Sequence, residues 1–246
     1  MRIFILSFYF LLNACYAQKA SVSNIILWPD SHLSTNHNDS IKYPVVQVTN
    51  STVSNKINQS IRREILLDED QKKGIKDALH QAARKWLITL EYEITYNNHG
   101  LLSITLITEG MGAYPSTSYY YLNFDLSTGS QIKGADLIKS DKLDDFRKMV
   151  LSDKKDSLSE YLKEEQTMLG KKEIDSSDWE SIIDIVQNDC LNKGNIDKFS
   201  LKKDFLEIMD ECEFPHVILG LAPAYHLRYP IKYLNNFLSP YIKMKL

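Results

Sequence analysis

The stretch that decides the fold runs from Trp86 to Leu126 and reads WLITLEYEITYNNHGLLSITLITEGMGAYPSTSYYYLNFDL. Apolar and polar residues alternate in three segments of it, as they do in strands with one buried face. Asn97-Asn98-His99-Gly100 separates the first two segments and consists of residues that tolerate positive φ, which a tight turn requires. The stretch therefore predicts an antiparallel hairpin followed by a third strand.

The three predicted strands share an apolar face. In the first strand the expected buried residues are Trp86, Ile88, Leu90, Tyr92, Ile94 and Tyr96, followed by Leu102, Ile104 and Leu106 in the second and Tyr120, Leu122, Phe124 and Leu126 in the third. Such a face is stable only when other elements cover it. The polar face is expected to carry Glu91 and Glu93, and also Tyr119 and Tyr121.

Two segments before this stretch have the period of amphipathic helices. Val53, Ile57, Ile61 and Ile65 recur every four residues, and a second apolar stripe runs from Ile75 to Trp86. We expect these helices to cover the sheet. The predicted fold class is α+β, an antiparallel sheet covered by helices over residues 41–246, either as one unit or as two small α/β halves, residues 41–112 and 113–246.

The amino terminus has the features of an export signal. Arg2 precedes an apolar run that ends at Leu12 and is too short to span a bilayer, and small residues follow up to Ala17. We interpret residues 1–17 as a signal peptide and residues 18–40 as a polar leader. The alternative is a lipoprotein signal in which Cys15 is lipidated. Both interpretations predict an extracytoplasmic protein that is periplasmic, secreted or anchored in the outer membrane.

Composition narrows the possible functions. Hydrophobic residues make up 43% and charged residues 25% of the chain, which is typical of a globular protein, and the net charge is −3. No basic stripe interleaved with aromatic residues is present, so nucleic-acid binding is not expected. Cys190 and Cys212 either form a disulfide in an oxidising compartment or remain buried thiols.

Few residues suggest catalysis. Glu91 and Glu93 are two positions apart on one strand face, about 7 Å, which is compatible with some glycosidases and equally with any solvated strand face. Gly-x-Ser-x-Gly, Ser-x-x-Lys, His-Glu-x-x-His and Walker-type motifs do not occur. His32 and His37, with Asp30 and Asp39, match no metal-site spacing. We expect no enzyme, cofactor or metal, with a hydrolase of cell-wall polymer as the alternative.

Three tyrosines are the candidate ligand-binding residues. Tyr119 and Tyr121 occupy the outer face of the third strand, and Tyr114 comes shortly before it. Tyrosine offers a large contact area at a low cost in rotamer entropy, so an open row of tyrosines suits binding. The alternative is that a second layer buries them, which would favour a purely structural envelope component.

Several short motifs resemble one known family. They are Leu101-Leu102-Ser103-Ile104, Gly112-Ala113, Asn123-Phe124-Asp125-Leu126, Thr128-Gly129 and Asp136-Leu137. Together they resemble the RsiV-like extracytoplasmic domain family, domain of unknown function 3298, with an amino-terminal half of the 4163 type. The likeness spans about residues 40–240. It departs from the family at Met111-Gly112-Ala113-Tyr114, because the family usually has His after Gly-Gly-Ala.

The resemblance implies a non-catalytic binding module of the bacterial cell envelope. It implies structural roles for Gly112, Ala113, Asn123, Asp125 and Gly129. The partner that the resemblance implies is a lysozyme-type protein. Because the chain is expected in the cell envelope, cell-wall glycan is a second expected partner. We expect no contact with a membrane other than through a lipid anchor.

Overall fold

The computed structural model describes residues 18–28, 40–67, 70–112, 114–171, 176–191, 195–210, 212, 214, 222–223 and 226–246. The chain forms two compact units. Unit 1 comprises Met1–Lys133, Ser200–Lys203 and Met244–Leu246, and unit 2 comprises Gly134–Phe199 and Asp204–Lys243. The sequence suggested a subdivision between residues 112 and 113. The division follows Lys133 instead, because the strand after residue 113 pairs with the preceding strand along its whole length.

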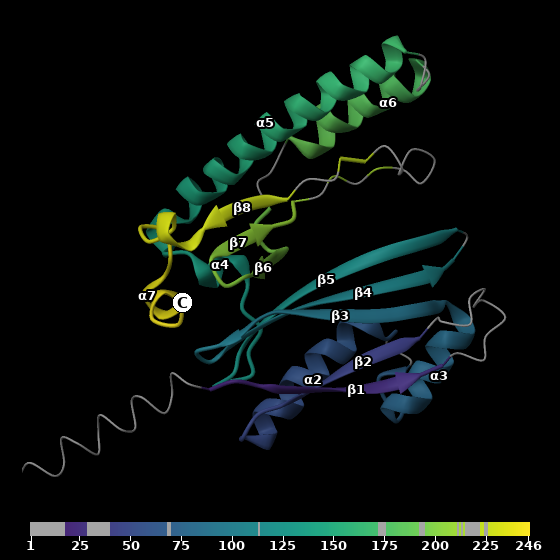
Figure 1. Ribbon diagram of the computed structural model, residues 1–246, viewed down its shortest axis with the longest axis vertical. Helices are drawn as coiled ribbons and strands as arrows, with labels where there is room; N and C mark the ends of the chain where they lie inside the picture. The colour runs from purple at the N-terminus through teal and green to yellow at the C-terminus, as the bar shows by residue number, and fades with distance from the viewer. Residues whose placement is uncertain are drawn as a thin grey trace, which may run out of the picture. The chain divides into compact units, whose positions relative to one another are not determined.

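Unit 1 contains a five-stranded sheet with the strand order β1-β2-β3-β4-β5 (Figure 1). Its elements are β1 Ser21–Leu27, β2 Ile41–Gln47, α2 Ser51–Ile65, α3 Ile75–Lys85, β3 Leu87–Asn98, β4 Leu101–Met111 and β5 Pro115–Asp125. The sheet is mixed, whereas the sequence predicted an antiparallel one: β2 runs parallel to β3, with Ile41 opposite Leu90. The two helices between these strands form a crossover, which returns the chain to the same end of the sheet. With its helices and two sheets, the chain is an α+β protein.

Strand β1 lies within the stretch interpreted as a polar leader. It pairs antiparallel with β2 from Ser21 opposite Gln47 to Leu27 opposite Ile41. Its residues are half-buried or exposed, as in a strand at the edge of a sheet. Residues 1–17, which include the proposed signal peptide and Cys15, lie outside the described residues.

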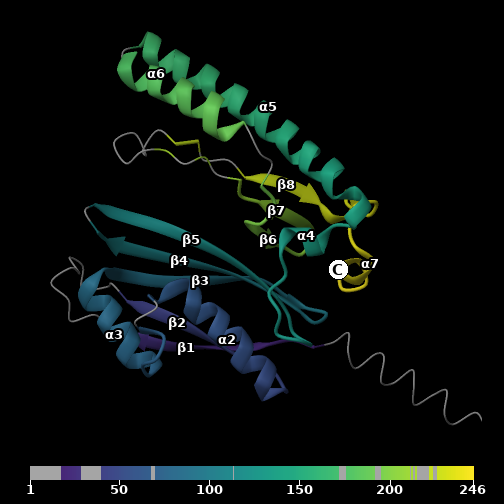
Figure 2. The ribbon, with the colours of Figure 1, turned by 180° about the vertical axis from the view of Figure 1, so that it is seen from behind.

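Helices α2 and α3 cover one face of this sheet, as the sequence predicted (Figures 1 and 2). The core between them contains Val53, Ile57, Ile61 and Ile65 from α2, Ala78, Leu79, Ala82 and Ala83 from α3, and Leu102, Ile104, Leu106, Leu122, Phe124 and Leu126 from the β4–β5 region. Most of these side chains are fully inaccessible to solvent. Burying each aliphatic side chain contributes roughly 1.5–3 kcal/mol, so this layer is the main stabilising feature of unit 1.

Strand β3 follows the predicted alternation only in part. Leu87 and Leu90 are both fully buried, although they have opposite parity, and Ile94 is 40% exposed. The irregularity in the β3–β4 register between Leu87 and Thr89 accounts for the burial of Leu87. A bulge inserts a residue and thereby changes which face the following side chains occupy.

Unit 2 combines helices with short strands. Its elements are α4 Gly134–Leu137, α5 Leu143–Gly170, α6 Ser176–Ile185, a π-helical turn Val186–Cys190, β7 Phe205–Ile208, β8 Leu227–Pro230 and α7 Pro240–Lys243, with short 3-10 helices at Ser140–Lys142 and Ile231–Tyr233. Strand β6, Phe199–Leu201, is divided between the units, and the second sheet has the order β6-β7-β8. Within the described ranges, no helix is both long and apolar enough to cross a bilayer.

Candidate functional site

Two tyrosines form an aromatic platform on β5. The rings of Tyr119 and Tyr121 stack with an interplanar angle of 9° and centroids 6.5 Å apart. They lie two positions apart in an extended strand and therefore project from the same face. Tyr119 is 48% exposed and Tyr121 is half-buried, while Tyr114 before the strand is 64% exposed. The outer face of β5 thus carries accessible aromatic surface in unit 1.

The strand register brings the two tyrosines into line with two glutamates. Tyr119 is opposite Ile107, which is opposite Glu91, and Tyr121 is opposite Thr105, which is opposite Glu93. Side chains of directly opposed residues point to the same side of a sheet. Because the aromatic and the acidic positions are two strands apart, about 10 Å of sheet surface separates them. We define this face, Tyr119 and Tyr121 with Glu91 and Glu93, as the tyrosine–glutamate face.

Each glutamate on this face forms an ion pair with a lysine. Glu91 Oε1 lies 2.6 Å from Lys42 Nζ, and Glu93 Oε1 lies 3.3 Å from Lys202 Nζ. Both carboxylates are more than half exposed, so the pairs are surface interactions worth at most about 1 kcal/mol each. The carboxylates remain accessible hydrogen-bond acceptors, and the lysines add donors at the same edge of the face.

A distant segment of the chain positions Lys202. The Ser200 hydroxyl donates to Thr95 Oγ1 at 2.8 Å, and the Leu201 amide donates to Ser103 Oγ at 3.1 Å. These bonds fix residues 200–203 against the outer face of β3 and β4. The sequence alone did not indicate this contact, because it joins residues about 100 positions apart.

Asp125 and Gly129, two of the motif residues taken from the family resemblance, shape the turn after β5. Asp125 Oδ1 accepts hydrogen bonds from the Ser127 amide at 2.7 Å and the Ser127 hydroxyl at 2.6 Å, and Gly129 has φ of 68°. Asn123 is buried, and its backbone carbonyl accepts a bond from the Ile132 amide. Gly112 is exposed at the end of β4. Ala113 lies outside the described residues.

The two cysteines of the folded region form a disulfide. Cys190 and Cys212 are bonded, with Cα atoms 5.1 Å apart, in a small core of unit 2 that also contains Leu158, Ile182 and Val186. Of the alternatives that the sequence left open, the structure has the bonded form. In the described ranges, no group of three His, Cys, Asp or Glu side chains is arranged to hold a metal ion. Asp30, His32, His37 and Asp39 lie outside those ranges.

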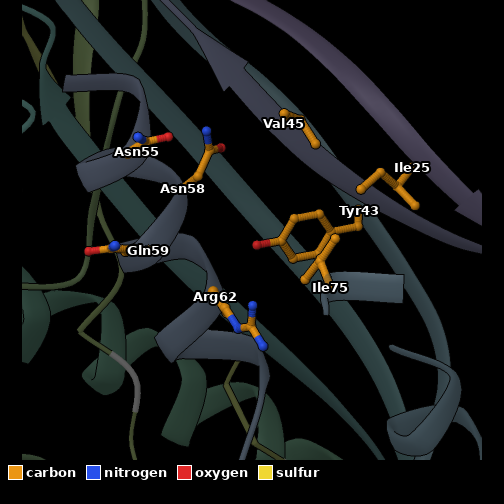
Figure 3. A pocket seen from close by; sticks show the side chains of 8 residues that line it. All are labelled: Ile25, Tyr43, Val45, Asn55, Asn58, Gln59, Arg62 and Ile75. Atoms are coloured by element: carbon orange, nitrogen blue, oxygen red, sulfur yellow. The ribbon is translucent and has the colours of Figure 1, made fainter. Parts of the chain in front are cut away.

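A cavity in unit 1 contains residues that the sequence did not single out (Figure 3). Its volume is about 280 Å³. Four elements contribute its lining: Ile25 from β1, Tyr43 and Val45 from β2, Asn55, Asn58, Gln59 and Arg62 from α2, and Ile75 from α3. The only hint in the sequence is that polar residues of α2, including Arg62, flank its apolar stripe.

No protein-family model matches the chain, and no curated protein matches it. A solved structure of a DUF3298 family member from Bacteroides fragilis superposes with a TM-score of 0.55 at 12% identity, covering 92% of this chain and 95% of that one. A DUF3298 family structure from Pseudomonas aeruginosa gives a TM-score of 0.47 at 13% identity and covers 91% of this chain and 95% of that one. From the Bacteroides comparison we conclude that the chain has the fold of a DUF3298 family structure.

Proposed function

We propose that this chain is a non-catalytic, extracytoplasmic binding module of the bacterial cell envelope, and that its tyrosine–glutamate face binds cell-wall glycan. The observation that carries the proposal is the stacked pair Tyr119 and Tyr121 on an accessible strand face, in register with Glu91 and Glu93. The chain's proposed membership of the DUF3298 family, in its RsiV-like branch, is consistent with this role.

The chemistry of the face suits a sugar chain. The C–H surface of a sugar ring packs on an aromatic ring, and its hydroxyl groups donate to carboxylates and accept from ammonium groups. Two nearly parallel rings, with centroids 6.5 Å apart, offer apolar surface to successive sugars. Glu91 with Lys42, and Glu93 with Lys202, supply acceptors and donors beside that platform.

The extracytoplasmic location has two independent supports. Residues 1–17 have the charge, the apolar run and the small residues of an export signal. The Cys190–Cys212 disulfide is of a kind that persists in oxidising compartments and is rare in the cytoplasm.

Co-sedimentation with insoluble peptidoglycan tests the proposal. We expect the chain to sediment with purified sacculi and to be released by soluble wall fragments. A lysozyme pull-down is run in parallel, since the family resemblance implies such a partner. If lysozyme retained the chain and sacculi did not bind it, glycan would be rejected as the ligand and a protein ligand would be assigned to the module.

Product analysis separates binding from hydrolysis. A binding module leaves sacculi intact, whereas an envelope hydrolase that used Glu91 or Glu93 would release soluble muropeptides over time. Release that is lost in Glu91→Gln or Glu93→Gln would contradict the non-catalytic assignment. If neither sacculi nor lysozyme bound the chain, the proposed binding function would be rejected.

A further inference from the structure

The cavity of unit 1 contains a tyrosine hydroxyl that has no hydrogen-bond partner among the described residues. Tyr43 is only 3% exposed, and within the described part of the chain its hydroxyl makes no hydrogen bond. In Figure 3 the ring lies in the cavity, and the hydroxyl points towards the polar side chains of α2. Burial raises the pKa of this phenol, and nearby Arg62 only partly opposes the rise. Tyr43 therefore stays neutral and is available as a donor.

The cavity also contains a cation whose charge the described residues leave uncompensated. Arg62 Nη2 donates to the backbone carbonyl oxygens of Asp70 at 2.7 Å and of Lys73 at 2.5 Å. These bonds hold the guanidinium in place, and its Nε is buried with no acceptor in the part of the chain that the structure describes. The Asp70 carboxylate is paired with Lys73 Nζ at 2.6 Å, and within the described residues Arg62 forms no ion pair. A half-buried cation of this kind favours an anionic ligand.

The remaining lining divides into two parts. Ile25, Val45 and Ile75 form an apolar side, while Asn55 and Gln59 present amides on the other. Asn58 is engaged with the backbone of β2, since its side chain donates to the Val46 carbonyl and accepts from the Val46 amide, both at 2.8 Å. Asn58 thus fixes α2 against β2, and Asn55 and Gln59 are left to contact a ligand.

We propose that this cavity binds a small amphipathic carboxylate. Its carboxylate accepts hydrogen bonds from the Tyr43 hydroxyl and the Arg62 guanidinium, and its apolar part packs against Ile25, Val45 and Ile75. A single cation matches a monoanion, whereas a phosphate dianion would be left with uncompensated charge. The site is separate from the tyrosine–glutamate face and does not depend on the proposed glycan binding.

Titration of the full chain with hexanoate, observed through methyl and amide NMR signals, tests the site. We expect saturable shifts centred on Val45, Ile75 and Gln59, and binding of the neutral analogue hexanamide at least about tenfold weaker, because it lacks the charge that Arg62 attracts. Phosphate at the same concentrations should produce no comparable shifts.

Two variants link binding to the named groups. Tyr43→Phe removes only the hydroxyl, so hexanoate affinity should fall several-fold while the thermal midpoint stays unchanged or rises, because the hydroxyl makes no bond to lose. Arg62→Met should abolish the preference for hexanoate over hexanamide, and Tyr119→Ala is the control that leaves hexanoate binding intact. Absence of saturable binding, equal affinity for hexanamide, or unchanged affinity in Tyr43→Phe would each overturn the site. If Arg62→Met does not fold, Tyr43→Phe alone decides.

Discussion

Gly129 lies directly against the backbone of Val53, and a Cβ atom at position 129 would be 2.9 Å from the Val53 carbonyl oxygen. Gly129 also has a φ of 68°, a backbone conformation that residues other than glycine rarely adopt. Gly129→Ala should therefore destabilise unit 1 by about 1–3 kcal/mol, measured by chemical denaturation. Gly112→Ala is the matched control, because a Cβ atom there would meet no other atom within 4 Å and its φ is not in the left-handed region. Equal stability of the two variants would contradict this account of the turn.

The Cys190–Cys212 disulfide should stabilise unit 2. The cysteines are 22 residues apart in sequence. Closing a loop of that size lowers the entropy of the unfolded chain and contributes roughly 3 kcal/mol. We expect Cys190→Ala/Cys212→Ala to unfold at a lower denaturant concentration, and reduction of the unmodified chain to have a similar effect. Thiol titration of unreduced, denatured protein should find neither residue free. Two reactive thiols at these positions would contradict the prediction.

Glu207 should stabilise unit 2 in a pH-dependent manner. Glu207 is 6% exposed, and its carboxylate lies 2.8 Å from Arg228 Nε and 3.3 Å from His226 Nδ1. Burial alone would raise the pKa of Glu207, but the Arg228 hydrogen bond, followed by the His226 interactions, outweighs it and lowers the pKa. The folded state therefore favours the ionised form, so the stabilisation is complete above the ordinary glutamate pKa of about 4.3 and is lost as the pH falls through the lowered folded value.

Denaturation of Glu207→Gln against pH tests this prediction. At pH 7 the variant should be less stable by about 1.5–3 kcal/mol, because hydrogen bonds to a charged group are lost. The difference should shrink towards zero as the pH falls below the ordinary glutamate value. A difference that is independent of pH would show that shape, and not charge, makes Glu207 important.

Ionisation of Glu165 should destabilise unit 2, the opposite of the effect expected for Glu207. Glu165 is 5% exposed, and its Oε2 is buried without a hydrogen-bond partner among the described residues. Burial, with a smaller contribution from the charge of Glu164, raises the pKa of Glu165. The folded state therefore resists ionisation, and stability falls as the pH rises from the ordinary glutamate value towards the raised one. Glu165→Gln should be more stable than the unmodified chain at pH 7 and equally stable at pH 3. A loss of stability at pH 7 would contradict this assignment.

The parts of the fold that could be predicted are those that local periodicity determines. Leu102, Ile104, Leu122 and Phe124 were predicted on one face and are buried there, because a strand alternates its side chains regardless of its surroundings. The turn at His99 and Gly100 was equally predictable, since both residues have positive φ. Periodicity also identified α2 and α3 as the cover of the sheet.

Features that depend on pairing could not be read from local pattern. The parallel contact of Ile41 with Leu90 follows from the path of the α2–α3 crossover, and the burial of Leu87 follows from a bulge. The alternation of side chains along a strand placed Glu91 and Tyr119 on the outer faces of their own strands. Only the register of β3, β4 and β5 shows that they share one row. The cavity at Tyr43 and Arg62 was missed because four elements contribute to it.

The tyrosine–glutamate face can be tested directly by calorimetric titration with a soluble peptidoglycan fragment. We expect the unmodified chain to bind saturably and Tyr119→Ala/Tyr121→Ala to bind at least about tenfold more weakly, because the aromatic platform is removed. Tyr233→Ala/Tyr241→Ala is the matched control, since it removes two other exposed tyrosines, of 69% and 41% exposure, from unit 2. Weakened binding in the first variant alone is the predicted result. Equal binding by all three proteins, or no binding by any, would contradict the account.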